Sequence, residues 1–267
     1  MKLFIRTILF LVIAINFTGC SLLTAAGISS QGQPTKEVKG DLSSNQTKSV
    51  VEVDHSNWDA LLKKYVDEEG FVDYTNFQQD KNQLDNYLRM LSELEPTEKW
   101  SVQELLAYYI NLYNAATVQL ILDNYPIESI KDINGAFTKA FITIGNRKLS
   151  LGGIENGVLR KMNEPRIHFA INCASYSCPK LLNEAFMVNK IDAQLKKVTQ
   201  EFINGDKNQI SETNPKFSKI FDWYGSDFKL VGETDIITYI NQYSETKINP
   251  ETQYSFLEYD WSLNEQE

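Results

Sequence analysis

The stretch "LLAYYINLYNAATVQLIL", Leu105–Leu122, decides the fold of this chain. It is apolar around nearly its whole circumference, so the helix that it predicts must lie in the interior of a domain. Ser101 and Glu104 have the spacing of an N-terminal capping box, and Pro126 lies just beyond the other end. We therefore expect one long core helix that ends near Asn124, with the rest of the domain built around it.

Two asparagines, Asn111 and Asn114, lie three residues apart on one face of this predicted helix. A buried amide without partners costs about 1–3 kcal/mol, so both side chains must form hydrogen bonds. Either they tie neighbouring backbone in place, or they line a ligand site. In the second case Asn114 and Tyr113 are the candidate substrate-binding residues.

The remaining residues predict a mixed architecture. Helices are expected at 56–66, 77–94, 152–162, 190–204 and 235–243, a hairpin around Gly145–Asn146, and strands at 166–172 and 254–259. Helices outnumber strands and do not alternate with them. The pattern indicates the α+β class: a single mixed domain with helices packed around a small, largely antiparallel sheet.

The N-terminus has the layout of a lipoprotein signal. Lys2 and Arg6 precede an apolar run that is shorter than the ~20 residues of a membrane-spanning helix. The run leads to "FTGC", residues 17–20, which resembles a lipobox and implies cleavage before Cys20 and lipid attachment to it. Ser21 follows, where an aspartate would favour retention at the inner membrane. We expect a lipoprotein of the cell envelope, anchored at the outer membrane with its domain in the periplasm; an ordinary cleaved signal is the alternative.

Composition divides the chain into residues 1–20, the signal peptide, residues 21–50, and residues 51–267. Residues 21–50 are polar and lack aromatic side chains, which predicts a flexible tether, whereas residues 51–267 predict one globular domain. Without Lys2 and Arg6, 24 basic and 35 acidic residues remain, a net charge of −11. Such an acidic chain is disfavoured as a nucleic-acid partner. The membrane, reached through the lipid anchor, is the expected partner, and a small-molecule or peptide ligand is not identified.

A second stretch, "IHFAINCASYSCPKL" at 167–181, gathers His168, Cys173 and Cys178 in a chain with two histidines and three cysteines. Four interpretations are open: a thiol nucleophile with its base, a disulfide, buried core residues, and a zinc site. Zinc is the weakest, because Cys-x4-Cys is looser than the usual Cys-x2-Cys and a fourth ligand would have to come from far along the chain. We expect no metal and no cofactor.

As a nucleophile, Cys173 would need an adjacent base, and His168 is the candidate. Side chains alternate along a strand, so residues five apart face opposite ways unless the chain bends near Asn172. The turn-forming residues of "NCASYSCP" favour such a bend. Glu155 or Asn111 would then orient the imidazole. An oxidising envelope equally favours a disulfide between Cys173 and Cys178, which would leave no free nucleophile.

Five blocks of the sequence resemble one known family, the domain of unknown function family 547, over residues 100–264. The blocks are "YYINLYNAATV", "KLSLGGIENGVLR", "RIHFAINCASYSCPKL", "FDWYGSDF" and "EYDWSLN". The family has no assigned biochemistry, so the resemblance implies a domain and not a reaction. Asn156 stands where the family usually carries a histidine after the glutamate; if that histidine is the family's base, this chain is impaired.

Two functions therefore remain open. One is a thiol hydrolase or acyltransferase with Cys173 as nucleophile. The other is a non-catalytic binding or scaffold module with a groove near Asn111, Asn114 and His168. The aromatic pairs at 223–224 and at 259 and 261 could form a recognition surface, but the composition favours packing in the core.

Overall fold

The computed structural model describes residues 29–40, 42, 49–230 and 233–267. The predicted signal peptide and Cys20 lie outside these residues, as do residues 21–28, 41 and 43–48 of the predicted tether. Signal, lipidation and tether therefore stay predictions.

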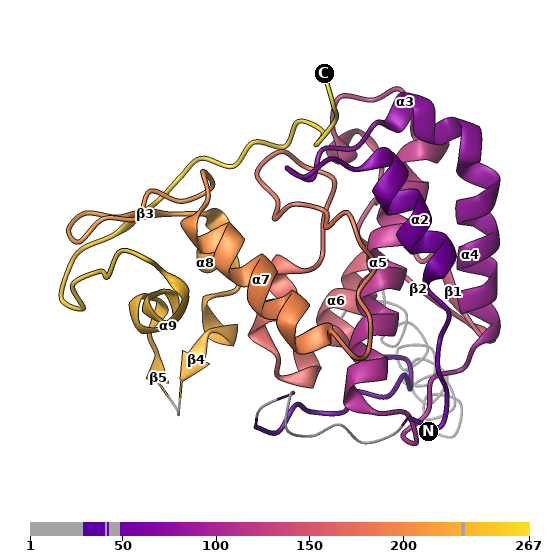
Figure 1. The fold of residues 1–267 in the computed structure, drawn as a ribbon, viewed down its shortest axis with the longest axis horizontal. Coiled ribbons are helices and arrows are strands. Elements are labelled where there is room, and N and C mark those ends of the chain that lie inside the picture. The colour runs from indigo at the N-terminus through magenta and orange to yellow at the C-terminus, as the bar shows by residue number, and fades with distance from the viewer. Residues whose placement is uncertain (1–28, 41, 43–48, 231–232) are drawn as a thin grey trace, which may run out of the picture.

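Helix α5, Val102–Asn124, is the core helix that the sequence predicts, and it packs against α4, α6 and α7 (Figure 1). Ser101 caps it, because its Oγ accepts a hydrogen bond from Glu104 N at 3.0 Å. The Glu104 side chain does not complete the capping box and instead accepts from Val53 N at 2.9 Å. By length and composition α5 could cross a membrane, but 89% of its most apolar stretch is buried inside the domain, as in the core helix of a soluble protein.

Helices cover α5 on two sides (Figure 1). The N-terminal group is α2 (Ser56–Tyr65), α3 (Tyr74–Phe77), the 3-10 turn η1 (Gln78–Asp80) and α4 (Lys81–Glu93). The second group is α6 (Leu151–Gly157), η3 (Leu159–Met162), η4 (Pro165–Phe169) and α7 (Ile191–Asn204). Beyond α7 lie α8 (Lys219–Trp223), η5 (Gly225–Asp227) and α9 (Ile236–Tyr243), while η2 (Ile130–Asp132) follows α5.

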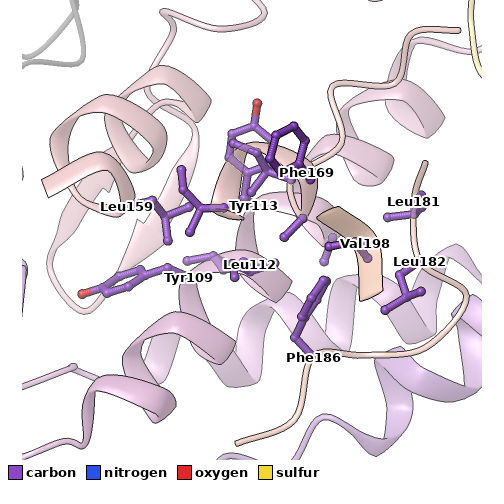
Figure 2. Packing of buried hydrophobic residues seen from close by; sticks show 14 of the residues in the cluster. Tyr109, Leu112, Tyr113, Leu159, Phe169, Leu181, Leu182, Phe186 and Val198 are labelled. Carbon is purple, nitrogen blue, oxygen red and sulfur yellow. The ribbon is translucent and has the colours of Figure 1, made fainter. Parts of the chain in front are cut away.

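The core between these helices is one buried cluster. Figure 2 shows side chains of α5, η3, η4, α7 and the loop at 181–186 meeting in it, among them Leu112, Phe169 and Phe186. Each of these three is at most 1% exposed. Burial of one such side chain contributes about 1.5–3 kcal/mol, so this cluster fixes η4 and the chain that follows it against α5.

The strands are short and pair two at a time. Antiparallel pairs join β1 (Ile142–Ile144) to β2 (Arg147–Leu149) and β4 (Lys229–Leu230) to β5 (Glu233–Thr234), and a parallel pair joins β3 (Lys216–Phe217) to β6 (Ser255–Phe256). The first pair is the hairpin predicted around Gly145, whose φ of +56° suits a glycine. Among the described residues these pairs do not merge into one sheet. The α+β class is confirmed.

The strand predicted at 166–172 is wrong, because the 3-10 helix η4 occupies its first residues. Pro165 stands at the first helical position, and the Glu164 side chain accepts from Arg166 N at 3.2 Å. Consecutive residues from Ile167 to Ala170 are buried, since core surrounds the turn on all sides. The helix predicted at 77–94 comprises the end of α3, the 3-10 segment η1 and α4, and the helix predicted at 152–162 consists of α6 followed by the 3-10 segment η3. The strand predicted at 254–259 is limited to β6.

The described part of the predicted tether contacts the domain. Val38 N donates to Met162 O at 2.7 Å, and Tyr109 Oη donates to Gln33 Oε1 at 3.2 Å. Leu42 is buried. Parts of the predicted tether therefore pack against the domain.

The C-terminal segment decides where the site lies. After β6 the chain runs back across the molecule toward α3 (Figure 1). Val72 N donates to Asn264 O at 2.8 Å, and Tyr176 N donates to Ser262 O at 2.7 Å. The first bond holds the segment against the chain before α3, and the second holds it against the loop that carries the two cysteines.

Candidate functional site

The bend expected near Asn172 is present, and the Asn172 side chain forms it. Its Oδ1 accepts from Ala174 N at 2.8 Å, and its Nδ2 donates to Pro179 O at 2.8 Å. Ala174 has a φ of +57°, a left-handed conformation that costs a residue with a Cβ about 1–2 kcal/mol. Strained backbone of this kind clusters at functional sites.

The Cys173 thiol lies among hydroxyl groups. Its Sγ is 3.1 Å from Ser175 Oγ and 3.3 Å from Tyr259 Oη, and these two oxygens are 2.8 Å apart. Burial raises the pKa of Cys173, but hydrogen bonds from Cys178, Ser175 and Tyr259 outweigh it and bring the pKa below that of an ordinary cysteine. Cys173 is therefore a partly buried thiol with an increased fraction of the nucleophilic thiolate.

Cys178 is the second thiol of the same loop, and no disulfide joins it to Cys173. Its Sγ accepts a hydrogen bond from Cys173 N at 2.9 Å. Burial, followed by the neighbouring Cys173 thiol, raises the pKa of Cys178 well above the ordinary value. The two cysteines thus differ in acidity. In the described part of the chain, no three His, Cys, Asp or Glu residues are grouped to hold a metal ion.

Both cysteines border a pocket of about 320 Å³. Four of the candidate catalytic and substrate-binding residues line it: Tyr113, Glu155, His168 and Cys173. The remaining wall is mostly apolar and aromatic, which is the usual composition of a small-molecule site. The bend at Asn172 and the position of η4 bring these residues together from α5, α6 and the cysteine loop.

His168 is held by an acidic residue that the sequence analysis does not single out. His168 Nε2 is 2.9 Å from Asp227 Oδ2, and Arg160 Nη2 donates to Asp227 Oδ1 at 2.7 Å. Burial raises the pKa of Asp227, but Arg160 and His168 outweigh it and hold the pKa well below the usual range. An ionised carboxylate only accepts hydrogen bonds, so Nε2 of His168 donates to Asp227.

His168 Nδ1 has no hydrogen-bond partner among the described residues. The ring stacks on Tyr224 at a centroid distance of 4.1 Å. His168 and Cys173 therefore share a pocket, but neither ring nitrogen is bonded to the sulfur. The orienting residue is Asp227 and not Glu155 or Asn111, which is a correction to the prediction.

Glu155 and Asn156 of α6 also line the pocket. Tyr113 Oη donates to Glu155 at 3.5 Å. Asn156 Nδ2 donates to Gly152 O at 3.1 Å, and its Oδ1 accepts from Arg160 Nη1 at 2.8 Å. Position 156 is thus a pocket position in this chain, and Asn156 supports the arginine that holds Asp227.

Asn111 and Asn114 tie backbone in place and do not line the pocket. Asn111 Nδ2 donates to Phe186 O at 2.8 Å, and its Oδ1 accepts from Phe186 N at 3.0 Å. Asn114 Nδ2 donates to Ala170 O at 3.0 Å, and its Oδ1 accepts from Asn172 N at 2.9 Å. Both amides are used by the backbone, so we leave them out of the proposed site. Asn114 nevertheless fixes the residues just before Cys173.

Aromatic residues form one side of the pocket mouth. Trp223 is 45% exposed, and its ring lies 4.8 Å from that of Tyr259 and 5.9 Å from that of Trp261. The core position favoured for these rings is therefore wrong for Trp223. The sequence could not show this, because Tyr259 and Trp261 reach Trp223 only when the C-terminal segment folds back.

Residues 97–203 match the protein family described as "Protein of unknown function, DUF547". No curated protein and no solved structure matches the chain. The matched residues include α5, His168, Cys173 and Cys178, whereas Asp227 and Tyr259 lie outside them. The predicted resemblance is thus confirmed for the part of the chain that carries the cysteine loop: residues 97–203 are a match to the domain of unknown function family 547.

Proposed function

We propose that this chain is a lipid-anchored envelope protein whose domain is a cysteine-dependent hydrolase or acyltransferase. The observation that carries the enzymatic part is the Cys173 thiol, which lies at a pocket of about 320 Å³ within hydrogen-bond reach of Ser175 and Tyr259. A thiol that is more acidic than usual and borders a pocket is the form a catalytic cysteine takes.

In the proposed reaction the Cys173 sulfur attacks the carbonyl carbon of an ester, thioester or amide. His168 takes the thiol proton at Nδ1, and Asp227 stabilises the ring through Nε2. The proton passes to the leaving group as the intermediate collapses to a thioester on Cys173. Water then releases the acyl group as an acid, or a second nucleophile carries it away.

The oxyanion must be stabilised by side chains. Cys173 N already donates to Cys178 Sγ, and Ala174 N already donates to Asn172 Oδ1. The hydroxyl groups of Ser175 and Tyr259, at 3.1 and 3.3 Å from the sulfur, are the side-chain donors beside it. The absence of a direct Cys173–His168 bond is compatible with this role, because catalytic hydrogen bonds often tighten only when substrate binds.

The test is acylation by p-nitrophenyl acetate, followed by mass spectrometry of the tryptic peptide of residues 167–180, which contains Cys173 and Cys178 but not Cys20. We expect acetylation of Cys173 at least tenfold faster in the folded full-length chain than in the same chain unfolded in urea. Cys173→Ala should abolish the label, and Cys178→Ser should retain it. Equal rates in the folded and unfolded chains would refute a catalytic thiol.

A non-catalytic binding module is the second candidate, and the aromatic mouth of the pocket favours it. Exposed tryptophan rings are used to stack flat ligand faces. Trp223→Ala should leave the melting temperature nearly unchanged, because the ring is 45% exposed. Loss of ligand binding in this variant, together with slow acylation of the wild type, would favour the binding module.

The anchor is supported only by the signal-like N-terminus that ends in "FTGC", and it needs its own test. Full-length protein expressed in a Gram-negative bacterium should incorporate labelled palmitate and fractionate with the outer membrane. Cys20→Ser should lose both properties. A wild-type chain recovered unlabelled from the soluble periplasm would contradict the anchor and leave the enzymatic proposal untouched.

A further inference from the structure

We propose that Cys173 and Cys178 form a redox-active dithiol that reduces disulfides and is itself converted to an intramolecular disulfide. This activity rests on the same nucleophile as the proposed function, but it differs in substrate class and in its need for the second cysteine. Of the two cysteines, acyl transfer requires only Cys173, whereas disulfide exchange requires both Cys173 and Cys178.

The loop between the cysteines is closed in a way that brings them together. Asn172 and Pro179, the residues immediately outside the pair, are joined by the Nδ2–O hydrogen bond of 2.8 Å. Inside the pair, Cys178 N donates to Ser175 O at 3.0 Å and reverses the chain. Disulfides form where the two Cα atoms lie within about 7 Å, and a loop pinned at its neck holds the two cysteines near each other.

The second sulfur already points at the first cysteine. Cys178 Sγ accepts from Cys173 N at 2.9 Å, so it lies beside the backbone of the residue it would bond. The Cys173 sulfur rests on Ser175 and Tyr259 and can reach Cys178 by leaving these hydroxyls. Rotation of the Cys173 side chain is therefore the main change that the structure needs.

The two thiols differ in exposure and in pKa, as disulfide exchange requires. Cys173 is partly exposed at the pocket, while Cys178 is only 5% exposed. The pKa of Cys173 is lowered, despite burial, by hydrogen bonds from Cys178, Ser175 and Tyr259, and burial raises the pKa of Cys178. An acidic outer thiol attacks and also leaves readily, and a shielded inner thiol reacts only with its neighbour.

The reaction balances without any other component. The Cys173 thiolate attacks one sulfur of a disulfide R–S–S–R, forms a mixed disulfide and releases one thiolate R–S⁻. The Cys178 thiol then loses its proton and attacks the Cys173 sulfur, which expels the second R–S⁻. The substrate disulfide gains two electrons, and the Cys173–Cys178 pair loses them.

The backbone N–H groups of Cys173 and Ala174 already have acceptors. This does not hinder disulfide exchange, because a thiolate leaving group needs no oxyanion hole. Cys173 N, which would serve a carbonyl oxygen, is instead bonded to Cys178 Sγ. The pocket volume of about 320 Å³ limits the substrate to a small disulfide or to one exposed cystine of a peptide.

The test uses the full-length chain in detergent, equilibrated with oxidised and reduced glutathione at a series of ratios and quenched with an alkylating reagent. The tryptic peptide of residues 167–180 reports the state of both thiols. Wild-type protein should convert between a dialkylated peptide and an internally disulfide-bonded one, reversibly and in a single two-electron transition. A wild-type peptide that stays dialkylated in fully oxidised glutathione would overturn the proposal.

Two variants separate the steps. Cys178→Ser should trap glutathione on Cys173 as a mixed disulfide, while Cys173→Ser should remain largely unmodified, because its remaining thiol is buried. A mixed disulfide with glutathione that persists in the wild-type protein would also overturn the proposal, because Cys178 would then not resolve it. Acetylation of Cys173 in Cys178→Ser with p-nitrophenyl acetate is read in parallel, so failure of the dithiol and failure of the acyl-transfer proposal are distinguished. Thermal melts of each variant exclude loss of fold.

Discussion

His168 Nε2 lies 2.9 Å from Asp227 Oδ2, although the two residues are 59 positions apart in the chain. The contact joins the 3-10 turns η4 and η5 and fixes which ring nitrogen carries the proton. It leaves Nδ1 of the ring buried and without a hydrogen-bond partner among the described residues, and general-base catalysis would depend on this atom.

Asp227→Asn should slow acetylation of Cys173 by at least tenfold, because an amide no longer fixes the proton on Nε2. The measurement is the rate of peptide labelling as a function of pH. Asp222→Asn is the matched control, since Asp222 is an exposed acid of the same segment that pairs with Lys219 and does not contact His168. Equal rates in the two variants would remove His168 from the proposed mechanism.

Tyr259→Phe should raise the pKa of Cys173 by about one unit or more, since a hydrogen bond to a charged group contributes about 1.5–3 kcal/mol. The pH dependence of iodoacetamide alkylation, read on the 167–180 peptide, measures this shift. Tyr254→Phe controls for the change of residue type, because Tyr254 is 42% exposed on another part of the surface. A thiol pKa unchanged in Tyr259→Phe would mean that the hydroxyl does not stabilise the thiolate.

Asn114→Ala and Asn111→Ala should each lower the free energy of unfolding by about 2–4 kcal/mol, because each leaves a buried backbone N–H and C=O without a partner. Only Asn114→Ala should also change the reactivity of Cys173, since Asn114 holds Ala170 and Asn172 while Asn111 holds Phe186. Urea unfolding and alkylation rates test the two parts. A Cys173 that is equally perturbed in both variants would show a general loss of packing instead.

Acid should destabilise the domain through His55. Burial lowers the pKa of His55 to about 4, against the charge of Asp54, whereas the unfolded value is 6.5. Between these pH values the unfolded chain binds more protons, so stability falls as the pH drops from about 6.5 to about 4, by about 3 kcal/mol in total.

The matched variant is His55→Asn, in which the amide can replace the 2.6 Å contact between Nδ1 and Tyr87 Oη. As the pH drops through this window, the unfolding free energy of the wild type should fall relative to that of the variant. Outside the window the difference between the two should stay constant. A difference that is flat from pH 4 to pH 7 would show that His55 does not titrate differently in the two states.

Local sequence was sufficient for the elements whose cause is local. The core helix follows from an all-round apolar stretch and a Ser101 cap, and the hairpin follows from Gly145 between alternating residues. The bend before Cys173 follows from Asn172, whose short side chain bonds the backbone two residues on. In each case a few neighbouring residues supply all the interactions that decide the conformation.

Only the tertiary structure decided the conformation of residues 166–172, wrongly predicted as a strand, and the composition of the site. The sequence at 166–172 predicted a buried strand. Pro165 and the Glu164 cap instead start a 3-10 turn, and residues 167–170 are buried because the core surrounds this turn. Asp227 of η5 reaches His168 from 59 residues away, and Tyr259 of the returning C-terminal segment reaches Cys173 from 86 residues away. Periodicity and capping report short-range energetics, whereas the partner of a buried imidazole or thiol depends on which distant segments the whole core brings together.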